Sequence, residues 1–184
     1  MDQLRPIALY SVIYKIILKV LANIIKYVLP FLTSSNQSSY VEGRKIMDNI
    51  ILSHELIHSL KFQKKPDMMI QLKMLKEFYK ISWDYMKKVW KAFGFNEDYI
   101  NWIMAMVSRA FFSILLNGSP SKPFFPSRGI RHGDTLSPFL FIVMDEGLSR
   151  SLKVANINNS LISLKLHDNA PSSTPQQFVR SLYY

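Results

Sequence analysis

The sequence contains no cysteine, few acidic residues for its number of basic ones, and no long uncharged apolar run. Zero cysteines exclude disulfide bonds and every metal site that uses thiolate ligands, and they leave the redox compartment undecided. No apolar stretch approaches the roughly 18 uncharged residues of a membrane span. The first residues also lack the charged-then-apolar pattern of a secretory signal. We therefore expect no signal peptide, no transmembrane segment and no membrane partner. An intracellular location follows, with the nucleus as one candidate compartment; the oligomeric state is left unspecified.

The shortage of acidic residues leaves a strong positive charge. The chain has 23 Lys and Arg against 13 Asp and Glu, a formal net charge of +10. This balance favours a polyanionic partner, and nucleic acid over an anionic membrane. Hydrophobic residues at 48% and aromatic residues at 13% argue against disorder, and 184 residues can form one domain with a sizeable core.

Residues 11–29 are predicted to form a helix that ends at Pro30. Three lysines of this stretch, Lys15, Lys19 and Lys26, lie roughly on one helical side. That arrangement also fits an interfacial membrane helix, but a packed amphipathic helix is the better interpretation. The apolar residues at near-helical spacing are Ile16, Val20, Ile24 and Val28.

A second helix is predicted at residues 45–60, after a break at Gly43. His54 and His58 lie four residues apart, as a pair of zinc ligands would. Because no third ligand is obvious nearby, we interpret them as ordinary histidines of a helix surface. The residues expected to be buried on this helix are Ile46, Ile50 and Ile57.

Residues 61–91 carry nine lysines against three acids, which places +6 of the net +10 in this segment. A charge run is usually a solvated face. Here it alternates with aromatic residues, a mixture that suits single-stranded or hybrid nucleic acid. The aromatic residues are Phe62, Phe78, Tyr79, Trp83, Tyr85 and Trp90.

The remaining predicted elements are mostly short. Helices are expected at 82–93 and 97–109, the second capped by Asn96. A strand at 111–116 is followed by a tight turn at Asn117 and Gly118, and a return strand starts near Phe124 and Phe125. Two further strands are expected at 68–72 and 162–166.

A short loop before an apolar helix at about 136–153 concentrates donor groups. It contains Arg128, Gly129, Arg131, His132 and Gly133. The glycines allow positive φ or close approach, and a donor-rich loop on a buried helix can cradle a phosphate backbone. A plain surface loop with solvated arginines is the alternative. The helix-start residues that follow are Asp134, Thr135, Ser137 and Pro138.

This loop also resembles a known motif. Arg131-His-Gly-Asp-Thr-Leu-Ser-Pro138 is similar to the Arg-Gln-Gly-Asp-Pro-Leu-Ser-Pro signature of reverse transcriptases from LINE-type (non-LTR) retrotransposons, of the kind found in plants. Further segments match that family in the same order along most of the chain. They are residues 5–7, 12–16, 19–23, 36–38, 43–44, 48–50, 82–84, 102–104, 116–120 and 146–150.

The resemblance implies a partial right-hand polymerase, an α+β and helix-rich fold with fingers and an incomplete palm. Residues 1–184 would form one partial reverse transcriptase domain, with finger-like elements at 1–66 and the incomplete palm at 67–184. Nothing in the sequence resembles the later palm elements or the thumb, so the domain is expected to be truncated and degenerate.

The resemblance also implies that the chain is not an active polymerase. The family binds a pair of Mg²⁺ ions through aspartates in two segments, because this hard cation prefers carboxylate oxygen. Lys73 occupies the first of these positions, and Arg180 and Ser181 occupy the other two. We therefore expect no metal site, no cofactor and no catalytic residue in this chain.

Other positions of the family pattern are retained. By resemblance, Phe78, Arg44 and His132 would border an incoming nucleotide, although Phe78 could equally be a core aromatic. Arg128, Arg131 and Gly133 would contact nucleic acid.

Our prediction is a reverse transcriptase domain by descent, without polymerase activity, that binds RNA, DNA or an RNA–DNA hybrid weakly and in a salt-dependent way. The alternative is a basic nucleic-acid-binding or interaction module with no catalysis.

Overall fold

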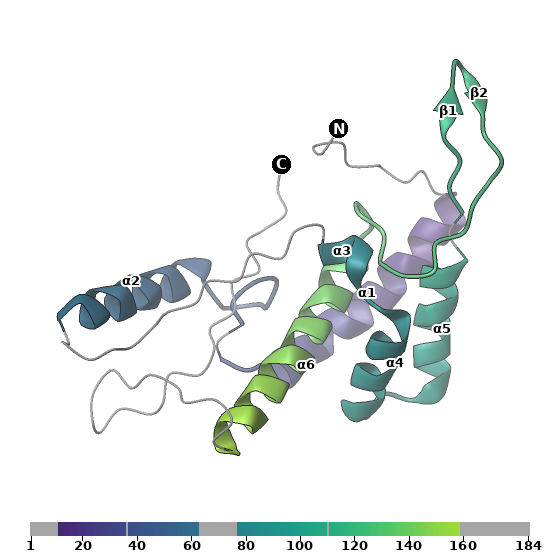
Figure 1. The fold of residues 1–184 in the computed structure, drawn as a ribbon. Coiled ribbons are helices and arrows are strands. Elements are labelled where there is room, and N and C mark those ends of the chain that lie inside the picture. The colour runs from purple at the N-terminus through teal and green to yellow at the C-terminus, as the bar shows by residue number, and fades with distance from the viewer. Residues whose placement is uncertain (1–10, 36, 63–76, 110, 159–184) are drawn as a thin grey trace. The chain divides into compact units, whose positions relative to one another are not determined.

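The computed structural model describes residues 11–35, 37–62, 77–109 and 111–158. As predicted, the fold is rich in helix; among the described residues the sheet is limited to one two-stranded hairpin (Figure 1). No helix in this described part is both long and apolar enough to cross a membrane. The elements are α1 (Val12–Leu32), α2 (Ile46–Phe62), α3 (Glu77–Lys80), α4 (Trp83–Ala92), α5 (Glu97–Ser108), β1 (Leu115–Leu116), β2 (Ser119–Pro120) and α6 (Ser137–Ile157).

The chain forms two compact units, neither of which is a single continuous segment. The first comprises Met1–Ile25 and Met74–Phe141, and the second comprises Lys26–Lys73 and Ile142–Tyr184. Helices α1 and α6 each contribute one end to the first unit and the other end to the second.

In the first unit, α1 lies antiparallel to α5. The Tyr99 hydroxyl donates to the Leu21 carbonyl over 3.0 Å, and the Tyr14 hydroxyl donates to the Met106 carbonyl. Burial raises the pKa of Tyr99 above its ordinary value, so this phenol is protonated and remains a donor at neutral pH. The α1 residues buried in this unit are Leu18, Leu21, Ala22 and Ile25.

Helices α4 and α5 form where predicted, and Asn96 caps α5 as predicted. The Ser82 hydroxyl accepts from the Tyr85 amide at the start of α4, and Asn96 accepts from the Asp98 amide over 2.9 Å at the start of α5. The chain reverses between them at Gly94, whose φ is +81°. Trp90 is 1% exposed and packs between the two helices.

Strand β1 of the hairpin is shorter than the strand predicted at 111–116. Leu115 pairs with Pro120 and Leu116 with Ser119, around the predicted turn at Asn117 and Gly118. Beyond these pairs, the regular ladder stops because Pro120 and Pro123 have no amide to donate. The Ser121 hydroxyl instead accepts from the Ile114 amide, and a single bridge joins Phe112 to Phe124.

In the second unit, α1 continues past Pro30 to Leu32, so the prediction that Pro30 ends the helix was wrong. A proline in the last turn removes only one intrahelical bond. The turn persists because the Thr33 amide and hydroxyl both donate to the Leu29 carbonyl, over 3.0 and 2.9 Å.

Helix α2 forms where predicted, but its expected core face was wrong. Ile46, Ile50 and Ile57 are 38%, 38% and 41% exposed. The spacing of i, i+4 and i+11 does place these three isoleucines on one side of the helix, but that side remains more than a third exposed. Asn49 takes the buried position and donates to the Ser38 hydroxyl over 2.9 Å. His54 and His58 are exposed, as predicted.

Helix α6 begins within one residue of its predicted start and is buried on several sides, as expected. Leu136, just before it, and Leu140, Ile142 and Val143 within it are each 1% exposed or less. It extends to Ile157, four residues beyond its predicted end.

Candidate nucleic-acid interface

The glycine loop, defined here as residues 128–134, is held against α3 and α4 in the first unit by its own backbone. The Gly129 amide donates to the Ile81 carbonyl and the Ile130 amide to the Phe78 carbonyl, each over 2.7 Å. The Trp83 indole donates to the Gly129 carbonyl over 2.7 Å. Gly129 has φ +89°, and a Cβ there would lie 2.8 Å from the Tyr79 carbonyl oxygen. Glycine therefore meets both expectations at this point, positive φ and close approach.

The ring of Phe78 packs against His132 of the glycine loop. Phe78 is 4% exposed, and its ring centroid lies 5.4 Å from that of His132 and 5.3 Å from that of Phe141, edge-on in both cases. His132 is half-buried and also stacks at 6.4 Å on Tyr79. In this structure Phe78 occupies the core, and its predicted contact with a nucleotide stays a prediction.

The Arg131 guanidinium lies over the ring of Tyr14, 4.9 Å from its centroid. This cation–π contact connects the glycine loop to α1. Burial raises the pKa of Tyr14, while the charge of Arg131 partly opposes that rise. The guanidinium is thus held by the protein itself, although it still adds positive charge to the loop.

Asp134 fixes the junction between the glycine loop and α6. Its Oδ1 atom accepts from the Leu136 amide over 3.0 Å and from the Ser137 amide over 2.5 Å. Burial raises the pKa of Asp134 above its ordinary value, against the opposing effects of these hydrogen bonds and of Arg131. Of the predicted capping oxygens, Asp134 is therefore the one seen to cap the helix.

Two members of the glycine loop face solvent. Arg128 is exposed, and so is Gly133, whose φ is +90°. Nothing lies within 4 Å of a Cβ built at Gly133. The exposed donors of this loop are consequently the Arg128 side chain and the backbone around Gly133.

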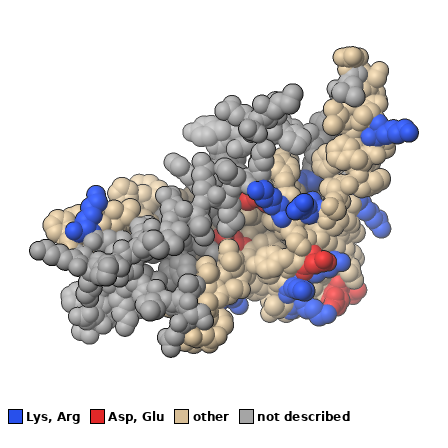
Figure 2. All heavy atoms as spheres, viewed as in Figure 1, with Lys and Arg blue, Asp and Glu red and all other residues tan. Residues whose placement is uncertain are grey.

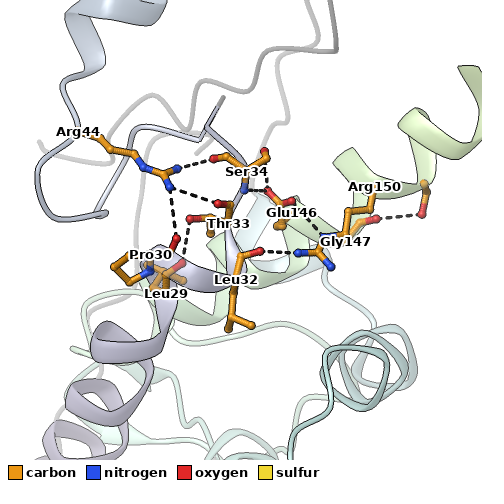
Figure 3. Close-up of polar contacts among 10 residues, drawn as sticks. Leu29, Pro30, Leu32, Thr33, Ser34, Arg44, Glu146, Gly147 and Arg150 are labelled. Atoms are coloured by element: carbon orange, nitrogen blue, oxygen red, sulfur yellow. Dashed lines mark hydrogen bonds and ion pairs between the residues drawn. The ribbon is translucent and has the colours of Figure 1, made fainter.

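Arg44 lies in the second unit, where it gathers backbone carbonyls at the end of α1 (Figure 3). Its guanidinium donates to the carbonyls of Gln37 over 2.7 Å, Thr33 over 3.2 Å and Pro30 over 3.5 Å, and also to that of Ser34. These carbonyls would otherwise lack helical partners. The structure therefore shows a stabilising role for Arg44, and a nucleotide contact stays a prediction.

Two buried carboxylates complete this polar cluster. Glu146 is 1% exposed and accepts from the amide and hydroxyl of Ser34, each over 3.0 Å, and from Arg150 over 3.2 Å (Figure 3). Asp145 accepts from the side-chain Nε2 of Gln37 over 2.9 Å. Sequence reasoning missed this cluster; the signal was two adjacent acids inside an otherwise apolar helix, which require buried partners.

Several predicted positions lie outside the described residues. Lys73, Arg180 and Ser181 are among them, as are the strands expected at 68–72 and 162–166. Among the residues that the structure does describe, no group of three or more His, Asp or Glu side chains could hold a metal ion.

Part of the lysine-rich segment is described. Lys80, Lys87, Lys88 and Lys91 are exposed, and Lys91 pairs with Glu97. Of the aromatic residues among these lysines, Phe78 and Trp90 are buried, and Trp83 is half-buried and bonded to the glycine loop. Tyr85 is 40% exposed.

Comparison with known proteins gives a consistent family. The model of the family described as "Reverse transcriptase (RNA-dependent DNA polymerase)" matches residues 1–166. The chain is 29% identical over 137 residues to the transposon TX1 uncharacterized 149 kDa protein of Xenopus laevis, covering 74% of this chain and 10% of that protein. It is also 29% identical over 103 residues to a retrovirus-related Pol polyprotein from type-1 retrotransposable element R2 of Popillia japonica, covering 55% and 17%.

A third relative is an uncharacterized mitochondrial protein of Arabidopsis thaliana. It is 40% identical over 57 residues, which cover 31% of this chain and 47% of that protein. The chain thus matches less than half the length of each of these curated relatives.

Proposed function

The chain belongs to the reverse transcriptase (RNA-dependent DNA polymerase) family, and from this membership we propose that it is a LINE-type domain that binds nucleic acid without polymerising it. In this proposal residues 1–66 correspond to fingers and 67–184 to an incomplete palm of a right-hand polymerase. The partner is RNA, DNA or their hybrid, bound weakly and with strong salt dependence. An intracellular site of action, with the nucleus as one candidate, goes with such a partner.

The loss of polymerase activity is supported by the residue types at the three positions that, by resemblance, correspond to the family's metal-binding aspartates. Lys73 and Arg180 carry cationic side chains, which repel Mg²⁺, and Ser181 offers only a neutral hydroxyl. These residues do not fit a magnesium pair, so we derive no catalytic step for this chain.

Residual binding is supported by one structural observation, the anchoring of the glycine loop. Gly129 fixes the loop backbone against α3 and α4, while Arg128 and the backbone at Gly133 remain exposed. A rigid loop that exposes an arginine side chain and the backbone at Gly133 suits a phosphate backbone. Its donor groups lose little conformational freedom on binding.

Primer extension on an RNA template tests the absence of catalysis. Folded protein, checked by circular dichroism, is supplied with Mg²⁺ and then Mn²⁺, beside an active reverse transcriptase as the positive control. We expect no extended product under either condition. Extension above the no-enzyme background would show that other carboxylates build a metal site.

Fluorescence anisotropy with labelled RNA, DNA and hybrid tests the binding. Affinity should fall as salt rises, and Arg128→Gln should reduce the log–log salt slope by about 0.7 to 0.9 if Arg128 contacts one phosphate. Lys19→Gln, which removes the same charge from an exposed position of α1 outside the glycine loop and the lysine-rich segment, is the matched control and should change the slope less. Absence of affinity for all three ligands at low ionic strength would contradict residual binding.

A protein-interaction module is the second candidate, favoured by apolar residues on the open side of α1. Ile13, Ile16 and Val20, all in the first unit, are 72%, 58% and 54% exposed. Soluble monomers rarely leave such a run uncovered. This candidate gains if the titrations show no binding while the protein is folded and monodisperse.

A further inference from the structure

Four phenylalanine rings of the first unit gather at the base of the β-hairpin. Phe111 and Phe125 are 66% and 69% exposed, with ring centroids 6.3 Å apart. Phe112 and Phe124 form a second, stacked pair with ring centroids 5.8 Å apart. Phe111, Phe124 and Phe125 remain 66%, 48% and 69% exposed, so packing within this chain does not account for these three rings.

The hydrogen bonding of the ribbon separates these rings into two faces. The Phe112 amide donates to the Phe124 carbonyl over 2.9 Å, and the Phe124 amide donates back over 2.8 Å. Their side chains therefore share one face, and those of Phe111 and Phe125 share the other, since side chains alternate along a strand. Phe112 is half-buried, so the Phe111–Phe125 face is the more open one.

The charge around these rings has a single sign. Between Asp98 and Asp134 the sequence contains no acidic residue, but it contains four arginines and lysines. Arg109, Lys122 and Arg128 are exposed. On the face shown in Figure 2, the hairpin at the upper right carries blue but no red atoms. An apolar protein-binding surface has no need of uncompensated cations, whereas a polyanion with flat apolar groups matches both features.

We propose that the hairpin, residues 109 and 111–128 of the described chain, is a stacking platform for unpaired bases of single-stranded RNA or DNA. The Phe111–Phe125 face takes one or two bases, and Arg109, Lys122 and Arg128 neutralise the flanking phosphates. This inference rests on the proposed nucleic-acid binding and narrows it: the ligand is single-stranded, and its bases contact the hairpin and not the lysine-rich helix α4. A duplex cannot use the rings, because its bases are already stacked.

Anisotropy titrations with three labelled ligands test the platform. They are a 12-nucleotide oligo-uridine, the corresponding oligo-thymidine, and a 12-base-pair DNA duplex, all at low ionic strength. Wild-type protein should bind both single strands more tightly than the duplex. The double variant Phe111→Ala and Phe125→Ala should bind the single strands about tenfold or more weakly, with duplex affinity nearly unchanged.

Two control variants separate stacking from other effects. Trp102→Ala removes another exposed aromatic of the first unit, 59% exposed on α5, and should leave all affinities unchanged. Phe125→Trp retains a flat ring and should therefore retain single-strand affinity. If Phe125 served only the packing of the hairpin, the larger indole would not be expected to preserve that affinity. Circular dichroism spectra and urea midpoints of all variants establish that they are folded.

The outcomes distinguish this inference from the function on which it rests. Wild-type binding with no effect of the double variant would overturn the platform and leave the proposed function standing. Equal weakening of single strands and duplex would also overturn it, because stacking would not be involved. If the double variant lost self-association of the protein but kept its affinity for single strands, the rings would be assigned to protein contacts and the platform would be overturned. No binding of any ligand by wild type would overturn both proposals.

Discussion

Gly129 and Gly133 show how the surroundings of a residue, and not its backbone conformation alone, decide its importance. Their φ angles are +89° and +90°. At Gly129 a Cβ would clash with the Tyr79 carbonyl oxygen at 2.8 Å, whereas at Gly133 it would meet nothing within 4 Å. The first glycine therefore serves packing as well as conformation, and the second serves conformation alone.

This difference makes a paired prediction. Gly133→Ala should cost about 1 kcal/mol of unfolding free energy, the penalty for a left-handed alanine. Gly129→Ala should cost about 3 kcal/mol, because the overpacking penalty is added to the same strain. Urea unfolding followed by circular dichroism measures both values. Equal losses would show that the glycine loop can move away from α3 at little cost.

Asp134 predicts a pH effect of definite sign. Because burial raises its pKa in the folded protein, the protonated form is favoured by folding, and its contribution to stability is lost as pH rises. The window begins at the ordinary value of 3.8 and extends to the raised pKa. Asp134→Asn retains the Oδ1 cap without the charge, so wild type should lose stability relative to it across this window.

Urea unfolding at a series of pH values measures that difference. Asp134→Ala serves as the control, since it lacks the cap and should be destabilised by about 1 kcal/mol at every pH. A wild-type advantage over Asp134→Asn that grows with pH would contradict the assigned sign.

At the scale of elements, the carboxyl end of α1 is the clearest case of a helix terminus completed by distant residues. Arg44 donates to four carbonyls around the last turn, and Arg150 donates to a fifth, that of Leu32, over 2.7 Å. A helix dipole also favours cations at this end. These contacts explain why a helix with Pro30 in its final turn still reaches Leu32.

Arg44→Ala should therefore lower the unfolding free energy by about 3 kcal/mol, because several partly buried carbonyls lose a charged donor. Lys45→Ala, at the exposed neighbouring position, should change it by less than about 0.5 kcal/mol. Thermal and urea unfolding compare the two. A stable Arg44→Ala protein with reduced nucleotide affinity would instead favour the role implied by the family resemblance.

At the scale of the whole molecule, catalysis would require carboxylates from segments far apart in the chain to converge on one metal pair. If the family resemblance places these residues correctly, Lys73→Asp restores only one of the three metal-binding positions, while Arg180 and Ser181 still lack carboxylates. We expect this single variant to show no primer extension. The triple variant, with aspartate at all three positions, is the informative comparison. Extension by the single variant would show that Arg180 and Ser181 are not the matching positions.

Much of the local structure was accessible from the sequence. Ser82 and Asn96 predicted helix starts, Asn117 and Gly118 predicted the hairpin turn, and the apolar run after Asp134 predicted a buried helix. Each of these signals depends on interactions among residues close in sequence, so it requires no knowledge of the rest of the fold.

The candidate interface was accessible only in part. The glycine loop and its cations could be found from the sequence, because donor-rich loops before helices have a compositional signal. The burial of Phe78, the contact of Arg131 with Tyr14 and the exposure of Phe111 and Phe125 could not. Each depends on which residues from distant segments cover a given side chain.

The sequence by itself determined that this is a basic, cysteine-free and helix-rich member of the reverse transcriptase family. It also predicts, by resemblance, that Lys73, Arg180 and Ser181 stand where the family has metal-binding aspartates. Those properties reside in residue identities and local order. Only the tertiary structure decided which aromatic rings enter the core and which remain open, and which arginines serve the fold. Burial depends on how the whole chain packs. Phe78 and Phe125 are the same residue type, yet Phe78 contributes its hydrophobic surface to the core and Phe125 leaves its surface exposed.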